Sequence, residues 1–288
     1  MRGVRCPLCD APPARAFTKA GYPIARCACG MIFVAEPVPP EVLERLYDES
    51  YFAGDAAGAV PGYRDYASEE PVMRRNFARR LALIERFAAP GRLLDVGCAL
   101  GFFVRVARER GWDASGVERS AYAARQAAVA GLPVVHGDFL TLAIAPGRLG
   151  AVTMLDVLEH VADPRAYVRR ARALVAPGGV LAIETADLAA PLARLSGRHY
   201  HFFTPPNHLS YFTRATLARL LAEEGFPEMR TFRVGKWLTV RRLLYHLYVR
   251  APRPLLGRLL ALAERTGLAG RAVPVNLGDD MLAVARAG

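Results

Sequence analysis

The sequence predicts an α/β fold with a mostly parallel sheet, and three features of the chain support this prediction. Between residues 91 and 185, apolar segments of strand length alternate with segments of helix length. A glycine-rich turn separates the first of these strands from the first helix, and an acidic residue ends the second strand. Repeated strand–helix units of this kind form a parallel sheet that helices cover on both faces.

The expected elements follow in chain order. A helix expected over 73–88 is amphipathic, with an apolar stripe of Phe77, Leu81, Ile84 and Phe87. The expected core strands are 92–96, 114–118, 133–136, 151–155 and 180–184, and two final strands are 229–234 and 281–285. The expected helices are 102–110, 121–130, 164–175 and 213–224, and Gly178-Gly179 is expected to cap the third of them. These elements make a seven-stranded sheet.

Four of the five cysteines lie in the first 30 residues, as Cys6-x-x-Cys9 and Cys27-x-Cys29 with 17 residues between the pairs. Close cysteine pairs in a cytosolic chain indicate a metal site rather than disulfides. Four thiolates satisfy a tetrahedral structural zinc ion. A segment of about 35 residues buries too little apolar area to fold alone, so the metal would supply stability. We therefore expect a zinc ribbon over 1–40, with free or redox-active thiols as the alternative.

The rest of the chain divides into two parts. A proline-rich linker leads into a helical segment over 41–90, which contains an expected loop from Tyr47 to Tyr66 and is expected to close over the active site. The domain with the parallel sheet then occupies 91–288, with insertions at about 187–212 and 236–272. The second insertion is expected to be helical throughout 237–272 and to form a lid.

The formal net charge of +11 is unevenly distributed, because ten basic residues and one acidic residue, Glu264, lie between Arg230 and Ala272. Such a segment attracts nucleic acid, an anionic membrane surface or a phosphate-bearing substrate, or it is simply a solvated helix face. No apolar run is long enough to span a membrane, and no apolar segment follows Met1. We therefore expect a cytoplasmic protein whose oligomeric state the sequence leaves open.

The glycine-rich turn reads Asp95-Val96-Gly97-Cys98-Ala99-Leu100-Gly101. Glycine is needed where a ligand approaches the backbone closely. No Lys-Ser or Lys-Thr pair follows, so the turn is not a phosphate-binding P-loop. Asp95 would repel a phosphate and attract a cationic ligand.

Two more acidic residues end the next two strands. Glu118 can accept hydrogen bonds from both hydroxyls of a ribose. Asp138 can accept one from the amino group of an adenine, with Phe139 beside the ring. The ligand that these residues imply is an adenosine with a positive centre and no phosphate, which describes S-adenosylmethionine.

Residues 91–185 resemble the core of the class I methyltransferases. The matching motifs are Leu-Asp-Val-Gly-Cys-x-x-Gly (94–101), Gly-Val-Glu (116–118), Gly-Asp (137–138), Asp-Val-Leu-Glu-His-Val-x-Asp-Pro (156–164) and Leu-Val-Ala-Pro-Gly-Gly (174–179). The resemblance implies that Asp95 holds the methionine end of the cofactor, Glu118 the ribose and Asp138 the adenine. It also places Gly97, Cys98, Gly101 and Asp156 in the cofactor site. Ala99 stands where the family usually has a glycine, and a dinucleotide-binding Rossmann domain is the alternative.

The segment 156–160 resembles the Glu-x-x-Glu-His motif of ubiquinone-biosynthesis O-methyltransferases, with Asp156 as its first acid. That resemblance implies a base or a divalent cation site at Glu159 and His160. The alternative is that both residues only shape the cofactor pocket. His208-Leu209-Ser210-Tyr211-Phe212 resembles a segment of sugar C-methyltransferases in which the histidine is the base, although Asn207 replaces that family's glutamate. The alternative for His208 is a helix cap in a packed aromatic loop.

The sequence therefore predicts an S-adenosylmethionine-dependent methyltransferase that acts on oxygen or carbon of a small molecule, such as a phenol, a quinone precursor or a nucleotide sugar. The first alternative is an RNA methyltransferase that binds RNA through the ribbon. We do not expect a nucleic-acid partner, because the ribbon has few basic and aromatic residues. The second alternative is a cofactor-binding protein without catalytic activity.

Overall fold

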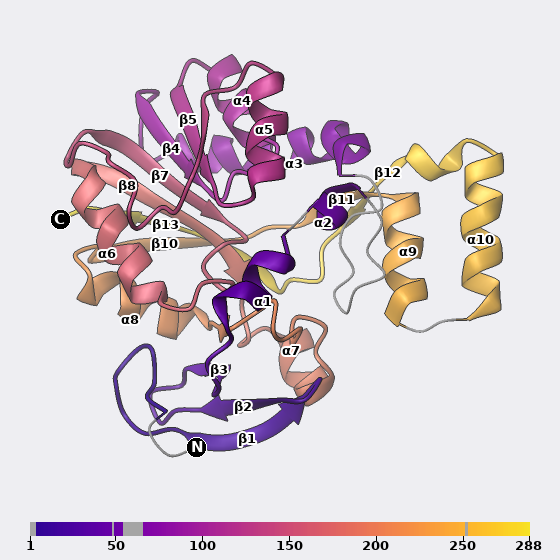
Figure 1. Ribbon diagram of the computed structural model, residues 1–288, viewed down its shortest axis with the longest axis horizontal. Coiled ribbons are helices and arrows are strands. Elements are labelled where there is room, and N and C mark those ends of the chain that lie inside the picture. The colour runs from indigo at the N-terminus through magenta and orange to yellow at the C-terminus, as the bar shows by residue number, and fades with distance from the viewer. Residues whose placement is uncertain (1–3, 48, 54–65, 251–252) are drawn as a thin grey trace.

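The computed structural model describes residues 4–47, 49–53, 66–250 and 253–288. Its central sheet has seven strands in the order β10-β13-β8-β7-β4-β5-β6 (Figure 1). In that order they are Glu228–Arg233, Asp280–Arg286, Val175–Ala186, Leu149–Leu155, Arg92–Val96, Asp113–Glu118 and Val134–His136. Strands β8, β7, β4, β5 and β6 run parallel, and β13 runs antiparallel to its two neighbours. The expected α/β fold with seven core strands is confirmed.

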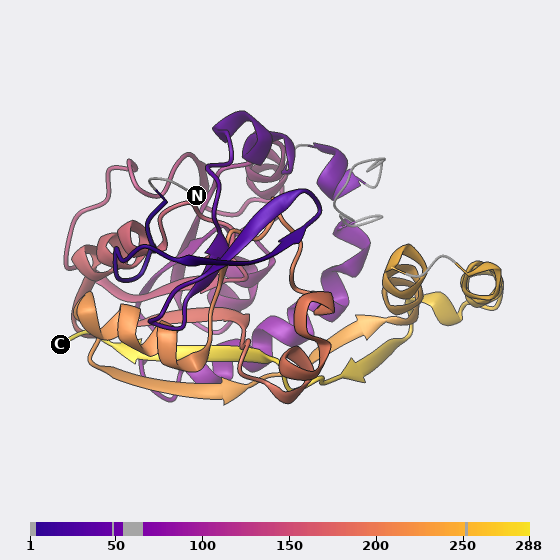
Figure 2. The same ribbon diagram turned by 90° about the horizontal axis from the view of Figure 1, so that it is seen from below.

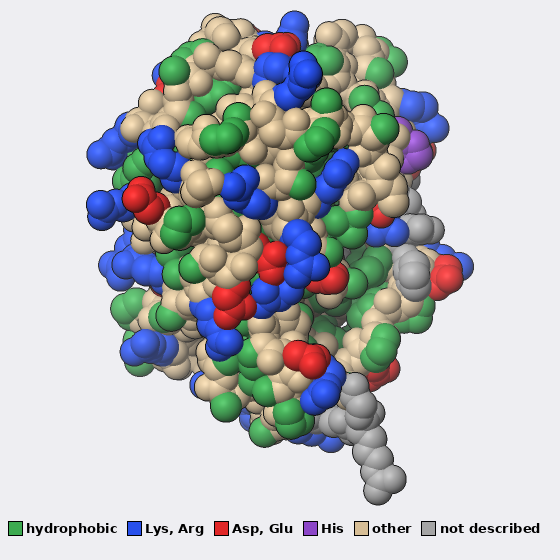
Figure 3. Space-filling model, turned by 90° about the vertical axis from the view of Figure 1, so that its left-hand side faces the viewer, with side chains coloured by type: hydrophobic (Ala, Val, Ile, Leu, Met, Phe, Trp, Pro, Cys, Tyr) green, Lys and Arg blue, Asp and Glu red, His purple; other side chains and the backbone are tan. Residues whose placement is uncertain are grey.

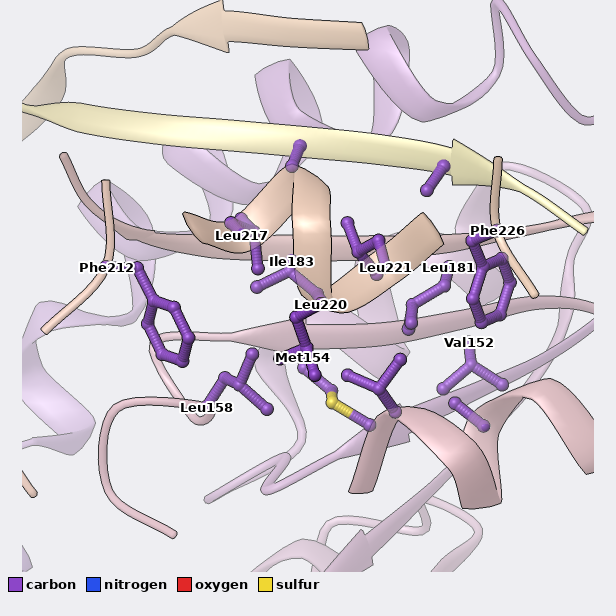
Figure 4. Packing of buried hydrophobic residues seen from close by; sticks show 14 of the residues in the cluster. Val152, Met154, Leu158, Leu181, Ile183, Phe212, Leu217, Leu220, Leu221 and Phe226 are labelled. Atoms are coloured by element: carbon purple, nitrogen blue, oxygen red, sulfur yellow. The ribbon is translucent and has the colours of Figure 1, made fainter. Parts of the chain in front are cut away.

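Helices cover both faces of the sheet. One face carries α6 (Pro164–Leu174) and α8 (Arg214–Glu223), and the other carries α3 (Glu70–Ile84) and α4 (Phe102–Glu109); α5 (Ala121–Val129) packs beside β5 and β6. Successive residues of a strand point to opposite faces, so in β4 Leu94 packs toward α6 and α8 while Leu93 packs toward α3 and α4. Figure 4 shows the α8 leucines lying over Leu181 and Ile183 of the sheet.

The expectation that Gly178-Gly179 caps a helix is wrong. Helix α6 ends at Leu174, and both glycines lie within β8. A Cβ on Gly179 would lie 3.0 Å from the carbonyl oxygens of Leu149 and Gly150. Gly179 is therefore explained by the close approach of β8 to β7, at a place where the register of the two strands shifts.

The basic insertion is helical only in its middle, so the expectation of helix throughout 237–272 is wrong at both ends. Strands β11 (Lys236–Thr239) and β12 (Ala272–Val275) pair antiparallel as a two-stranded stalk. The stalk carries a helical hairpin of α9 (Val240–Arg250), α10 (Pro254–Arg265) and η3 (Leu268–Gly270). The two ends of the insertion lie side by side, and pairing with each other satisfies their backbone groups.

The described part of the segment between the ribbon and the core contains three short helices before α3. They are α1 (Pro40–Arg45), α2 (Glu49–Ala53) and η1 (Ala67–Glu69). A loop was expected at the position of α2, and residues 54–65 of that expected loop lie outside the described residues. No helix of the described residues is long and apolar enough to cross a lipid bilayer.

The N-terminal ribbon forms a four-stranded sheet in the order β1-β2-β3-β9. Its first three strands are Ala14–Lys19, Tyr22–Arg26 and Ile32–Val34, whereas β9 (Ser210–Tyr211) comes from the insertion that also holds α7 (Pro191–Ser196) and η2 (Gly197–His199). Ile32 pairs with Tyr211 and Phe33 with Ser210. The ribbon is thus completed by a strand from far along the chain, which the sequence pattern does not reveal. The predicted division at residues 40 and 90 stays a prediction.

Candidate active site

The glycine-rich turn connects β4 to α4 through three residues in the left-handed region. Gly97, Ala99 and Gly101 have φ values of +68°, +49° and +78°. The backbone N–H of Gly97 donates to the carbonyl of Val117 over 2.8 Å, which ties the turn to β5. A left-handed conformation costs a residue with a Cβ about 1–2 kcal/mol, which explains why glycine is usual at the position of Ala99. The turn nevertheless keeps its shape with alanine.

Glu118 lies at the carboxyl end of β5 and holds the turn in place. One of its carboxylate oxygens accepts the backbone N–H of Ala99 over 2.7 Å, and the other accepts that of Ser120 over 2.7 Å. Burial raises the pKa of Glu118, while these backbone donors oppose the rise. Each carboxylate oxygen can accept a further hydrogen bond from a ligand hydroxyl.

Asp95 lies at the end of β4 and is almost completely buried. The hydroxyl of Thr153 donates to Asp95 Oδ1 over 2.6 Å. Burial raises the pKa of Asp95 to about 7, and the nearby Glu118 carboxylate adds to the rise. Two buried acids beside one turn, with no basic side chain of the described residues hydrogen-bonded to either, suit a cationic ligand. The residues thus fit the sulfonium and ammonium charges of S-adenosylmethionine.

The other residues predicted to bind the cofactor differ in how their side chains lie. The Cys98 side chain is buried in the core, where a Cβ on Gly116 would meet its Sγ at 2.4 Å, so only its backbone can face the turn. Phe139 is buried with its ring 5.4 Å from that of Tyr167. Asp138 follows β6 and accepts the backbone N–H of Leu140. Their roles toward the cofactor stay predictions.

Asp156 follows β7 with a φ of +55° and belongs to a cluster of charged side chains. Its carboxylate accepts from Lys236 Nζ over 3.1 Å, and Lys236 also lies 3.7 Å from Glu184 and 3.3 Å from Asp280. Arg80 donates two hydrogen bonds to Glu184, of 2.9 and 2.8 Å. Burial opposes ionisation of Asp156, but Lys236 and Arg80 bring its pKa below the usual value. The cluster is not apparent from the sequence, because its five members come from five distant segments.

Glu159, His160 and His208 meet at the carboxyl end of the sheet. One ligand atom from each lies within 4.8 Å of the others, and the two imidazole rings are 4.6 Å apart. His208 Nδ1 lies 2.7 Å from the carbonyl of Phe202, and His160 Nδ1 lies 2.8 Å from the carbonyl of Asn207. A carbonyl only accepts, so each Nδ1 carries the hydrogen and each Nε2 keeps a lone pair.

Burial lowers the pKa of both histidines, which keeps them neutral at pH 7. Glu159 is fully buried, and neither of its carboxylate oxygens has a hydrogen-bond partner among the described residues. Burial and the charge of Asp156 raise the pKa of Glu159 well above its usual value. Such an unpartnered buried carboxyl group is rare outside functional sites, and beside two Nε2 lone pairs it can receive a proton or a cation.

Tyr47, which follows α1, reaches the same cluster. Its hydroxyl donates to Asn207 Oδ1 and lies 2.7 Å from His160 Nδ1. The segment over 41–90 therefore contributes the side chain of Tyr47 to the candidate site. This contact is consistent with the expectation that the segment closes over the active site. Tyr47 begins the loop expected from the sequence, but no motif there marks it as a residue of the site.

The ribbon touches the site through β9. The carbonyl of Glu159 accepts the backbone N–H groups of Leu209 and Ser210 over 2.7 and 3.1 Å, and Val34 of β3 donates to the carbonyl of Leu209 over 2.8 Å. A continuous set of backbone hydrogen bonds thus joins β3 to the segment that carries Glu159 and His160.

The segment 199–212, which carries His208, is rich in aromatic residues. Of these, Tyr200, Phe203 and Tyr211 pack in one buried cluster with Ile24 and other ribbon residues. Phe202 lies 4.0 Å from the His208 ring and is the aromatic side chain of this segment closest to the histidines. The cap of α8 is Thr213, in a capping box with Thr216, and not His208.

The four N-terminal cysteines form one cluster. Cys6 Sγ lies 3.6 Å from Cys29 Sγ, and Cys9 Sγ lies 3.4 Å from Cys27 Sγ. All four sulfur atoms lie within 4.8 Å of one another. Sulfur ligands at about 2.3 Å from a tetrahedral zinc ion are about 3.8 Å apart, so the four thiols fit such an ion with little movement.

Comparisons with known proteins agree with this geometry. A family model described as "Methyltransferase domain" matches residues 66–227. A protein named ubiquinone biosynthesis O-methyltransferase from Xanthomonas campestris pv. campestris is 28% identical over 179 residues, which cover 54% of this chain and 75% of that protein. A protein of the same name from Chromobacterium violaceum is 34% identical over 112 residues, or 35% of this chain and 47% of that protein.

Solved structures support the fold. A SAM-dependent methyltransferase from Archaeoglobus fulgidus superposes with a TM-score of 0.53 at 17% identity, over 77% of this chain and 98% of that one. A SAM-dependent methyltransferase from Thermotoga maritima, described as a possible histamine N-methyltransferase, gives 0.51 at 17% identity, over 75% and 90%. With the strand order, the turn after β4 and the matched family, these findings show that the chain belongs to the methyltransferase domain family and is a class I S-adenosylmethionine-dependent methyltransferase.

Proposed function

We propose that this enzyme methylates a hydroxyl oxygen of a small organic molecule and that His208 accepts the hydroxyl proton. The observation that carries the proposal is the meeting of two imidazole Nε2 lone pairs with the unpartnered carboxyl group of Glu159. Two relatives with the printed name of O-methyltransferases support oxygen as the acceptor atom.

When bound, S-adenosylmethionine supplies a methyl group on a sulfonium centre, which an oxygen lone pair can displace. Asp95, Glu118 and the turn between them would hold the amino-acid and ribose parts. His208 Nε2 would take the proton of the acceptor hydroxyl, while that oxygen would receive the methyl group that the bound cofactor would release from its sulfur. In its ionised form, Glu159 would stabilise the imidazolium that forms, since one of its carboxylate oxygens lies within 4.8 Å of a His208 ring nitrogen. Tyr47 and Asn207 keep His160 in the tautomer that presents Nε2.

The charge on one face of the molecule favours a small acceptor over RNA. Arg165 and Arg169 on α6 are paired with Glu223 and Glu224 of α8. On the face of the molecule shown in Figure 3, basic side chains are scattered among acidic and apolar ones and form no continuous basic area. Binding along a nucleic-acid backbone requires such an area.

The test is transfer of a labelled methyl group to two kinds of acceptor, a set of catechols and phenols and a total RNA preparation. We expect transfer to a phenolic hydroxyl, and transfer to RNA alone would contradict the proposal. On the accepted phenol, His208→Gln is expected to lower kcat about 10²- to 10⁴-fold without changing the affinity for S-adenosylmethionine. His199→Gln is the matched control, since His199 is an exposed histidine of the same segment.

The same three side chains also suit a divalent cation, which would replace His208 as the activating group. Adding Mg²⁺, Mn²⁺ or Zn²⁺ to chelator-treated enzyme distinguishes the two roles, provided that the zinc content of the cysteine cluster is measured in parallel. Activity that is unchanged by chelation and metal addition supports His208 as the base. Activity that depends on an added cation while the cysteine cluster keeps its zinc would contradict that role.

A further inference from the structure

The helical hairpin of α9 and α10 stands apart from the body of the enzyme. It is joined to the core by the β11–β12 stalk and extends to the side of the molecule in both views (Figures 1 and 2). Contacts at its base include Asn76 with the backbone of Trp237, and Thr239 with Glu69. The fold and the candidate active site give no reason for an extension of this kind, so it needs an explanation of its own.

One face of α10 is apolar and exposed. Leu255, Leu259 and Leu262 have exposed fractions of 65%, 40% and 55%. Their spacing of four and then three residues places them on the same side of the helix. Two other residues of α10 face the rest of the hairpin. Ala263 is buried, and Gly257 approaches Tyr248 of α9. The three leucines thus form an outward stripe that the hairpin does not use for its own packing.

Arginines flank this stripe. Arg258 lies three residues after Leu255, and Arg265 lies three residues after Leu262, so both border the leucines on one side. No carboxylate of the described residues lies within ion-pair distance of either guanidinium, in contrast to the paired arginines of α6. The sequence from 240 to 272 contains seven arginines and one acidic residue. The stripe is therefore both apolar and strongly basic at its border.

We propose that the outward face of α10 docks on an anionic membrane surface. Leucines that enter the boundary of the acyl chains, with arginines at the level of the headgroups, match the two chemistries of such a surface. A second copy of this chain fits less well, because a symmetric contact would bring the arginines of both copies together. Three leucines also provide far less apolar area than a stable dimer interface of about 1,200 Å² or more.

The test is flotation of the full-length, zinc-loaded enzyme with vesicles of phosphatidylcholine alone or of phosphatidylcholine mixed with phosphatidylglycerol. We expect at least about tenfold stronger binding to the mixed vesicles at low salt, and weaker binding as salt increases. The triple variant Leu255→Ser, Leu259→Ser, Leu262→Ser and the double variant Arg258→Glu, Arg265→Glu should each lose about tenfold or more of this binding.

Matched controls change equally exposed residues elsewhere. Leu195→Ser alters a leucine of α7 that is 88% exposed, and Arg125→Glu alters an exposed arginine of α5; both should bind the mixed vesicles like the unchanged enzyme. Unchanged melting temperature and cofactor affinity of the hairpin variants show that they are folded. Equal binding to both vesicle types, or hairpin variants that bind as tightly as the controls, would overturn the proposal. So would a dimer in sedimentation analysis that the leucine variant converts to a monomer, because the occupant would then be a second copy.

Discussion

The ribbon and the helical hairpin are both additions to the methyltransferase core, yet they are attached in opposite ways. The ribbon sheet contains β9, which lies more than 170 residues beyond β3 in the chain, and its residues share two buried clusters with the core and with segment 188–211. The hairpin is held by a stalk of two short strands and keeps apolar residues on its surface. The difference indicates that the ribbon supports the candidate active site through β9, whereas the hairpin is available for the membrane contact that we propose.

The largest expected effect comes from removing the metal ligands of the ribbon. We propose that the cysteine cluster holds a zinc ion, so the double variant Cys9→Ser, Cys27→Ser should lose this ion and at least about 5 kcal/mol of unfolding free energy, because structural zinc contributes roughly 10–16 kcal/mol in isolated zinc-finger peptides. Activity should fall with stability, since β3 holds the segment that follows His208. The measurements are metal content, denaturant unfolding and kcat.

Cys98→Ala is the matched control, because Cys98 is buried outside the cluster. It should keep one zinc ion per chain. A zinc-free double variant that is as stable and active as the unchanged enzyme would show that the ribbon is as independent of the core as the hairpin.

The second effect concerns Lys236, where the hairpin stalk meets the active site. Lys236→Met should destabilise the protein by roughly 2–3 kcal/mol, because Asp156, Glu184 and Asp280 would keep only Arg80 as a cationic partner; this range allows for the partial exposure of Lys236. Lys19→Met, which changes a half-buried lysine of the ribbon without a carboxylate partner among the described residues, should cost less than about 0.5 kcal/mol. Chemical unfolding of both variants measures the difference. Equal stability of the two variants would mean that the stalk is not coupled to the site.

The third effect is the pH dependence of cofactor binding. It should depend on neither the ribbon nor the hairpin, because it arises in the core. The pKa of Asp95 is raised to about 7 by burial, so a cationic cofactor binds best when Asp95 is ionised above that pH. Its affinity should fall about tenfold from pH 8 to pH 6, or about 1.4 kcal/mol.

Without cofactor, the contribution of Asp95 to the stability of the folded protein should decrease as the pH rises from about 4 through 7, because Asp95 ionises at a lower pH in the unfolded chain.

Calorimetric titration with S-adenosylmethionine at several pH values measures this dependence. Asp95→Asn should remove most of it while leaving an oxygen to accept from Thr153. A pH dependence that persists in this variant would assign the titration to another group.

The smallest effect is expected from deleting the hairpin. Thr239 and Ala272 are directly paired, so an Asn-Gly turn can replace residues 240–271 and close the stalk. Unfolding free energy should change by less than about 1 kcal/mol, with an unchanged pH profile of cofactor binding, because few buried residues are lost. Loss of cofactor affinity in this deletion would show that the hairpin acts as the lid that the sequence suggested.

Much of the core was predictable because its signals are local. Apolar strands and helices alternate with nearly the observed bounds, and the predicted apolar stripe of Phe77, Leu81, Ile84 and Phe87 is observed packed in a core cluster. The turn from Gly97 to Gly101 and the acids at the ends of β4 and β5 were recognised because each lies within a short motif. The ends of the basic insertion and the position of Gly179 were missed, since both depend on a partner strand.

The sequence by itself determined the order of strands and helices, the cysteine pairs and the residue types of the cofactor site, because hydrophobic periodicity and spacing act over a few residues. Only the tertiary structure brought Tyr47 to His160, placed His208 beside Glu159, and joined β9 to the ribbon. It also decided that Lys236 would neutralise Asp156 and that the leucines of α10 would face outward. Contacts of this kind depend on the packing of distant segments, which no local pattern of residues specifies.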